Sequence, residues 1–369
     1  MELYHAATDA EKILCMKADL THTPIGGTME LLPLCNMNCK MCYVRKSKTE
    51  MDAEGRMLSC DEWLSIADEA VEAGTLFLLL TGGEPLLYPE FRRLYSALAQ
   101  KGLILSVNTN GTLIDEKWAD FFAKYGCRRL NITLYGKNDE TYAALCRNPK
   151  GFSQVMRAAK LLKDRQVPFR LTCSVTPQNV DELPELYAIA KDLNVPLPAA
   201  SYMFPASRRG KGAAEQYRLT PEEAGKNVVR CYQYMNPQVN MEIASRLTLD
   251  KTKNPGKLKK AQGFSCHAGH SGFWMNWKGE LLPCGMFSEP KISLLEHSFR
   301  ECWDEIVKKC EEMPQCQKCM ECELQNICQV CPACCYTEGG STDAWPEYAC
   351  RMTHEMVRLM KSYIPEERK

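Results

Sequence analysis

The sequence predicts an α/β protein built as an open, partial (β/α)6 barrel with a cysteine-rich domain after it. Apolar, strand-like segments alternate with amphipathic, helix-like segments about six times before residue 205. This alternation is typical of a parallel sheet with crossover helices. A closed TIM-type barrel has eight such units, so six predict a TIM-like barrel that stays open. The cysteine-rich domain is predicted because twelve of the 21 cysteines lie between Cys266 and Cys350.

The repeating elements follow one another in chain order. We expect strands within 28–35, 75–81, 103–109, 129–135, 168–176 and near 197–203. We expect helices over 59–74, 89–101, 114–125, 151–166, 181–193 and 220–235. The run TLFLLLT at 75–81 is almost wholly apolar, as in a strand buried on both faces. In such folds ligands bind at the carboxyl ends of the strands.

The chain divides into four predicted parts. An N-terminal segment covers 1–27, the barrel 28–235, a linker 236–264 and the cysteine-rich domain 265–369. The linker contains a charged stretch with Pro and Gly. In the last part, 271–283 has the pattern of a hairpin turning at Lys278-Gly279, and a helix is expected over about 294–312. Cys302 and Cys310 on that helix are predicted to be structural.

Composition excludes several classes of function. Hydrophobic residues make up 45% and charged residues 25% of the chain, as in ordinary globular proteins. The 46 basic and 46 acidic residues balance, which argues against nucleic acid and membrane surfaces as partners. The N-terminus does not have the pattern of a signal peptide, and no apolar run reaches the ~18 residues of a membrane span. A cytoplasmic location, where thiols stay reduced, is therefore expected.

Three cysteines form the first chemical motif. Cys35, Cys39 and Cys42 have the spacing C-x3-C-x2-C on one predicted loop. Three thiolates can hold three corners of a [4Fe–4S] cube and leave one iron open to a substrate or cofactor. A zinc site would require four ligands at pair spacings, and no fourth cysteine lies nearby in the sequence.

This motif resembles that of the radical S-adenosylmethionine (radical SAM) superfamily, in which the open iron binds SAM. Further motifs occur in the family's order: Thr81–Pro85 is similar to its GGEP segment, 108–112 to its TNG segment and 132–136 to its I-S-L-x-G segment. The resemblance implies the SAM contacts Met41, Tyr43, Gly82, Gly83, Glu84, Pro85, Asn108, Thr133, Arg147, Ser174 and Val175.

The resemblance also implies a role for several of these residues. The segment with Glu84 would bind the SAM amino group, Thr133 the ribose and Arg147 the carboxylate. Met41 and Tyr43 would pack near the adenine, and Ser174 and Val175 would contact the adenosine. Simpler interpretations stay open: an ordinary glycine turn at 82–83, an exposed helix-end arginine at 147 and plain loop packing of Met41.

The C-terminal cysteines resemble the SPASM extension of radical SAM enzymes, which carries two auxiliary [4Fe–4S] clusters. Four cysteines match its second cluster: Cys319, Cys322, Cys328 and Cys350. Cys266, Cys284 and Cys331 match the first. The family's spacing after Cys328 would place the last of these at Pro332, so Cys334, Cys335 and Cys316 remain alternatives to Cys331. Structural zinc in a four-cysteine knuckle is the competing interpretation.

The resemblance implies that a 5′-deoxyadenosyl radical abstracts hydrogen from a substrate carbon, with electrons from a reductant such as flavodoxin or ferredoxin. Our first hypothesis is an oxidoreductase that matures a ribosomally made peptide by a crosslink, a thioether or a related oxidation. Only 34 residues precede Cys35, so leader recognition would use another surface or a separate protein.

Three alternative functions remain open. They are a sulfatase-maturing (formylglycine-generating) enzyme, a radical SAM dehydrogenase of a small molecule and, last, a non-enzymatic zinc or iron–sulfur module. Glu242 and Asp250 do not convincingly match the base of sulfatase-maturing enzymes, and no other catalytic base can be assigned.

Overall fold

A computed structural model gives the fold for residues 9–205, 215–235, 264, 266–324, 327–328 and 330–363. Apart from Phe264, the predicted linker lies outside these residues, and so do Glu242 and Asp250. The core is a nine-stranded sheet in the order β6-β5-β4-β3-β2-β1-β7-β8-β9. Six consecutive parallel strands form the barrel part: β1 (Gly26–Glu30), β2 (Phe77–Thr81), β3 (Ile104–Thr109), β4 (Arg129–Thr133), β5 (Phe169–Ser174) and β6 (Ala199–Ala200). The predicted open barrel of six units is confirmed.

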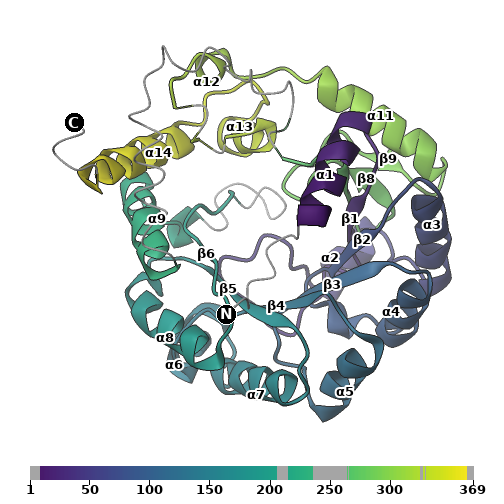
Figure 1. The fold of residues 1–369 in the computed structure, drawn as a ribbon, viewed down its shortest axis with the longest axis horizontal. Helices are drawn as coiled ribbons and strands as arrows, with labels where there is room; N and C mark the ends of the chain where they lie inside the picture. The colour runs from purple at the N-terminus through teal and green to yellow at the C-terminus, as the bar shows by residue number, and fades with distance from the viewer. Residues whose placement is uncertain are drawn as a thin grey trace.

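Helices cover the outer face of the curved sheet (Figure 1). They are α3 (Cys60–Glu72), α4 (Phe91–Gln100), α5 (Glu116–Tyr125), α6 (Asp139–Cys146), α7 (Gly151–Asp164) and α8 (Leu183–Leu193). Their starts follow local chemistry: Ser59 and Glu62 form a capping box that begins α3. Among the helices not predicted from the sequence are α6, α1 (Asp9–Thr21) and α2 (Lys48–Glu54). A capping box of Ser47 and Glu50 marks the start of α2 and was a usable signal.

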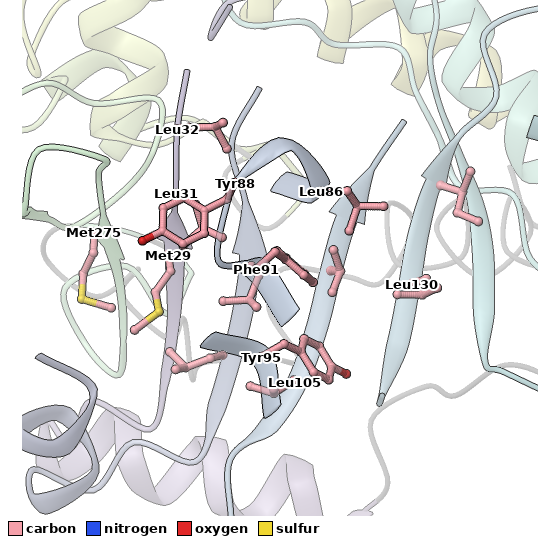
Figure 2. Packing of buried hydrophobic residues seen from close by; sticks show 14 of the residues in the cluster. Met29, Leu31, Leu32, Leu86, Tyr88, Phe91, Tyr95, Leu105, Leu130 and Met275 are labelled. Atoms are coloured by element: carbon pink, nitrogen blue, oxygen red, sulfur yellow. The ribbon is translucent and has the colours of Figure 1, made fainter. Parts of the chain in front are cut away.

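Apolar side chains between the sheet and these helices form the main core. Figure 2 shows Phe91 and Tyr95 of α4 over the strands, near Leu105. Phe91, Tyr95 and Phe122 are almost fully buried, with ring centroids 5.6–6.4 Å apart. Such aromatic contacts add to the free energy gained by burial itself. The core thus fixes the sheet whose carboxyl edge carries the motifs.

The C-terminal region joins the barrel at both ends of its sheet. β7 (Gly272–Met275) pairs in parallel with β1 and continues into β8 (Glu280–Leu282) and β9 (Ile292–Ser293), which confirms the predicted hairpin. At the other end α14 (Glu347–Met360) packs on α9 (Pro221–Met235), as Figure 1 shows. The remaining elements are α11 (Phe299–Glu311), α12 (Gln317–Met320), α13 (Pro332–Gly339), η1 (Pro85–Leu87), η2 (Val180–Glu182), η4 (Glu215–Tyr217) and η5 (Lys361–Tyr363). Among the described residues, no helix is long and apolar enough to cross a membrane.

The contact between β1 and β7 leads to a test of stability. A Cβ added at Gly27 would lie 2.1 Å from Cε2 of Phe273, which Phe299 and Trp303 hold in place at ring distances of 5.0 and 6.1 Å. We expect Gly27→Ala to lower the free energy of unfolding by about 1–3 kcal/mol through overpacking. Urea denaturation would measure the change.

The neighbouring residue provides the control for this test. A Cβ at Gly26 would meet Phe77 only at 3.9 Å, an ordinary contact. Gly26→Ala should therefore change stability little. Equal stabilities of the two variants would show that the β1–β7 contact does not set the packing in this way.

Candidate active site

A cavity of about 410 Å³ lies at the carboxyl ends of the barrel strands. Cys35, Cys39 and Cys42 line it together with residues of β2 to β5. The structure therefore brings the cysteine motif and most of the predicted SAM contacts around one space. Seven of those contacts line it: Met41, Tyr43, Gly82, Gly83, Asn108, Thr133 and Ser174.

Backbone hydrogen bonds hold the cysteine loop against the end of α6. The amide of Asn38 donates to the Cys146 carbonyl at 3.2 Å, and the amide of Lys40 donates to Leu145 at 3.0 Å. On the other side, the Asn110 side chain donates to Asn36 Oδ1 at 2.8 Å and approaches Cys35 Sγ at 3.6 Å. The TNG-like segment therefore positions the loop as well as lining the cavity.

Two thiols of this loop, those of Cys35 and Cys39, are strongly held in the neutral form. Burial raises the pKa of Cys35 to about 12. A hydrogen bond with the Cys146 thiol, and then burial, raise the pKa of Cys39 well above its usual value. Thiolates are the metal-binding form of cysteine, so a bound cation must supply the charge that stabilises them here. Three cavity-lining thiols on one loop are a donor set that suits an iron–sulfur cluster.

The glycine pair after β2 allows two backbones to approach closely. Cβ atoms at Gly82 and Gly83 would lie 2.5 Å from the Leu32 carbonyl oxygen and 2.2 Å from that of Leu34. The amide of Gly83 donates to the Leu32 carbonyl at 2.7 Å. The glycines therefore extend the β1–β2 pairing beyond the strands, up to the cysteine loop.

Glu84 faces the protein interior and does not line the cavity. Its carboxylate accepts hydrogen bonds from Thr109 Oγ1 (2.7 Å), the Asn110 amide (2.8 Å) and the Leu86 amide (3.2 Å). Burial raises its pKa to about 7, although these three bonds act in the opposite direction. In this structure Glu84 joins β2 to the segment after β3.

Three other predicted contacts also lie off the cavity lining. Pro85 begins η1 and is buried, and Val175 is buried beyond the end of β5. Arg147 is exposed and ends α6 in a left-handed conformation, with a φ of 54°. By contrast Thr133 lines the cavity, and its buried hydroxyl oxygen has no hydrogen-bond partner. An unpaired buried hydroxyl is the state expected of a group that awaits a ligand.

Several residues that line the cavity were not predicted from the sequence. Asn131, Arg170 and Thr172 project into it from β4 and β5. Polar residues alternate with apolar ones along these strands (RLNIT and FRLTCS), which indicates one polar face. Another part of the lining comes from beyond β5 and from the C-terminal region: Tyr202, Met203, Phe204 and Met286.

A second cavity, of about 200 Å³, lies in the cysteine-rich region. Cys319, Cys322, Cys328 and Cys350 all line it, beside Lys318, Trp345 and His354. The structure thus brings together the four cysteines that the SPASM resemblance groups. In the described part of the chain, no three Cys, His, Asp or Glu side chains converge closely enough to chelate a single metal ion.

Cys310 was predicted from the sequence to be a structural thiol, and its surroundings differ from that prediction. It is buried on α11, and a Cβ at Gly269 would lie 2.6 Å from its sulfur atom. Burial, and then the nearby thiols of Cys266 and Cys284, raise its pKa to about 12. Cys310 is therefore near enough to both cysteines assigned to the first auxiliary cluster to interact with them electrostatically. Cys334 and Cys335 are buried in a separate cluster with Cys316.

The fold and the site are those of an α/β partial barrel with a loop of three cysteines beside its main cavity. The sequence profile of the Radical SAM superfamily matches residues 29–190. The chain carries a radical SAM domain and is an enzyme of that class, which sets aside the non-enzymatic alternative. A [4Fe–4S] cluster and SAM are the cofactors of this domain.

Relatives match over most of the chain. An AdoMet-dependent heme synthase of Methanosarcina barkeri is 25% identical over 87% of this chain and 95% of its own length. The antilisterial bacteriocin subtilosin biosynthesis protein AlbA of Bacillus subtilis is 25% identical over 77% of this chain and 59% of its own. Streptococcus suis SuiB, solved with the precursor peptide SuiA, has the same fold, with a TM-score of 0.71 over 94% of this chain and 82% of its own at 16% identity.

Glu84 leads to a test of pH dependence. Its pKa is near 4.5 in the unfolded chain and about 7 in the folded protein, so between these values only the folded state keeps the proton. By linkage, its contribution to stability falls as the pH rises through this range. We expect the free energy of unfolding of the wild type to fall, relative to Glu84→Gln, between about pH 5 and pH 8 in urea denaturation.

Glu62 provides the control for this test. The hydrogen bond from Arg56 and those from Ser59 lower its pKa to about 2, so its titration lies below the pH range tested. The gap in stability between wild type and Glu62→Gln should stay constant. A constant gap for Glu84→Gln as well would contradict the raised pKa.

Proposed function

We propose that this chain is a radical SAM maturase of a ribosomally made peptide, which removes hydrogen to form a crosslink, a thioether or a related oxidised bond. The observation that carries the proposal is the composition of the main cavity. Its inner wall holds the cysteine loop and polar strand residues, and Met203, Phe204 and Met286 add apolar side chains from beyond the barrel strands. The names of AlbA and of SuiB with its precursor peptide support a peptide substrate.

In this proposal the chain binds, orients and shields the reactants. Cys35, Cys39 and Cys42 hold the cluster, and the unpaired Thr133 hydroxyl and the Ser174 side chain orient SAM. The bound cofactors supply the radical that abstracts hydrogen. Apolar side chains exclude water that would compete with the substrate.

A second candidate is a radical SAM oxidation of a small molecule. The observation in its favour is the heme synthase relative, which matches over 95% of its own length. The sulfatase-maturing alternative rests on a likeness of fold alone: native anSMEcpe with bound AdoMet matches 92% of this chain and 99% of its own with a TM-score of 0.68 at 20% identity. Glu242 and Asp250 lie outside the described residues. Turnover in the absence of any peptide would favour the small-molecule function.

We also infer that residues 265–369 form a SPASM domain with two auxiliary clusters, which makes three [4Fe–4S] clusters in the chain. The four cysteines of the second cavity suit one cluster. Cys266, Cys284 and Cys331 would hold the other, with Cys310 as an added ligand because its thiol interacts electrostatically with the first two. A fourth thiolate would close the cluster that the sequence left open.

The main experiment is anaerobic incubation with SAM, a reductant and a small peptide encoded by a neighbouring gene, followed by mass spectrometry. We expect the peptide to lose two hydrogens. An unchanged mass would call for a repeat in deuterated water, which detects epimerisation. Incorporation of no deuterium, together with turnover of a small molecule instead, would overturn the peptide function.

The cysteine loop is tested separately, by SAM cleavage. We expect Cys35→Ala to lower the formation of 5′-deoxyadenosine at least about 100-fold, because the open-iron cluster loses a ligand. Cys60→Ala is the control, since Cys60 is buried at the start of α3 and does not line the cavity. Unchanged SAM cleavage by Cys35→Ala would contradict the assignment of the cluster.

Iron analysis tests the ligands of the auxiliary clusters. Three cubes hold about twelve irons per chain, and we expect Cys310→Ala to lose about four of them after anaerobic reconstitution. Cys302→Ala is the matched control on the same helix, because its thiol donates to the Ser293 carbonyl at 3.5 Å. Retention of twelve irons by Cys310→Ala would remove Cys310 from the ligand set.

A further inference from the structure

Among the described residues that line the main cavity, Arg170 is the one that carries a charge. Arg170, Thr172 and Ser174 alternate along β5 and face the cavity together. Ser174 ends the strand near the level of the cysteine loop, whereas Arg170 lies four residues earlier. At the rise of a β-strand this places the two Cα atoms about 13 Å apart. Arg170 therefore belongs to the deep end of the cavity.

The guanidinium of Arg170 has no counterion in the described part of the chain. Its Nε is buried and makes no hydrogen bond. The adjacent arginines are satisfied: Arg129 Nε donates to Asn131 Oδ1 at 3.1 Å, and Arg128 pairs with Glu11 at 3.0 Å. No Asp or Glu is found among the described residues that line the cavity.

The electrostatics of this position favour an anion. Burial, and then the positive charges of Arg129 and Arg128, lower the pKa of Arg170 to about 10. The group therefore remains charged at neutral pH. Arg170 is half-buried, with its Nε fully buried, so its charge is partly removed from water without a partner. That has a cost, which a bound anion would offset. The deep end of the cavity is thus suited to an anionic group.

A carboxylate fits this position better than a neutral polar group. Its two oxygens match the planar, forked donors of an arginine in a bidentate pair. Asn131 is the register partner of Arg170 on β4, and it and Thr172 add polar groups on the same wall. Both a substrate and SAM carry carboxylates. The SAM carboxylate, however, is expected at the open iron, near the cysteine loop at the other end of the strands.

We propose that Arg170 binds a carboxylate of the substrate and so positions the substrate between the deep end of the cavity and the cysteine loop. For a peptide substrate, the carboxylate is an acidic side chain or the C-terminus. This inference rests on the proposed radical SAM function. The inference adds to that function the chemical group that the enzyme recognises.

Two small probes that differ only in charge test the proposal. The first is N-acetylglutamic acid α-amide, and the second is its uncharged isostere N-acetylglutamine α-amide. Binding of each to the reconstituted holoenzyme with SAM is measured by ligand-observed NMR. We expect the acid to bind about tenfold more tightly than the isostere, as for a charge-assisted hydrogen-bonded pair.

Variants assign this preference to one side chain. Arg170→Met should bring the ratio of the two affinities close to one, whereas Arg170→Lys keeps the charge and should keep part of the preference. Arg157→Met is the matched control, since Arg157 is exposed on α7. Because Arg157 lies outside the cavity, the affinity ratio, SAM affinity and substrate-free 5′-deoxyadenosine formation of Arg157→Met should equal those of the wild type.

Each contrary outcome has a definite meaning. Equal binding of the two probes by the wild type, or a preference that survives in Arg170→Met, overturns the proposal. A tenfold loss of SAM affinity in Arg170→Met assigns Arg170 to the SAM carboxylate, which also overturns it. If the wild type forms no 5′-deoxyadenosine but still prefers the acid, the proposed function fails and the carboxylate site stands.

Discussion

The parallel pairing of β1 with β7 is the interaction on which the rest of the structure depends. β1 lies between β2 and β7, and it leads directly into the cysteine loop. Residue Gly26 pairs with Gly272, so the contact joins segments almost 250 positions apart in the chain. Gly27 leaves room for the Phe273 ring, and Trp274 Nε1 donates to the buried Glu30 at 2.9 Å. This strand therefore fixes the cysteine loop to both halves of the molecule at once.

The inner face of the barrel is lined by polar side chains, which makes the fold less stable than an apolar lining would. Arg129 donates to Asn131 on the same strand at 3.1 Å, and Asn131 donates to Asn108 at 2.6 Å, which forms a chain of polar groups across β4 and β3. An apolar lining would pack at lower cost, since buried polar groups contribute only when they are satisfied. Most of this network is satisfied internally. On this inner face, the Thr133 hydroxyl and the Arg170 Nε have no hydrogen-bond partner among the described residues, and both residues line the cavity where ligands would bind.

The local sequence pattern predicted the features that depend only on residues close together in the chain. The apolar run of β2 and the spacing of Cys35, Cys39 and Cys42 needed no partner elsewhere in the chain to be interpreted. The pairing of β7 with β1 was not predictable, because a strand pattern does not identify its neighbour. Arg170 was missed because a polar residue that alternates with apolar ones in a strand usually faces solvent. Cys310 was missed because its relation to Cys266 exists only in three dimensions.

Tyr202 shows that the main cavity and the cysteine-rich region are physically continuous. It lines the cavity just after β6, and its hydroxyl lies 3.1 Å from the Cys334 thiol and donates to Glu338 at 2.8 Å. Glu338 in turn forms an ion pair with Arg218 at 2.5 Å, in which both side chains are about 90% buried. A buried pair of this kind tolerates little displacement, since loss of either partner leaves a charge uncompensated. The position of the cavity wall is therefore tied to the packing of the cysteine-rich region, and a change in one must be accommodated by the other.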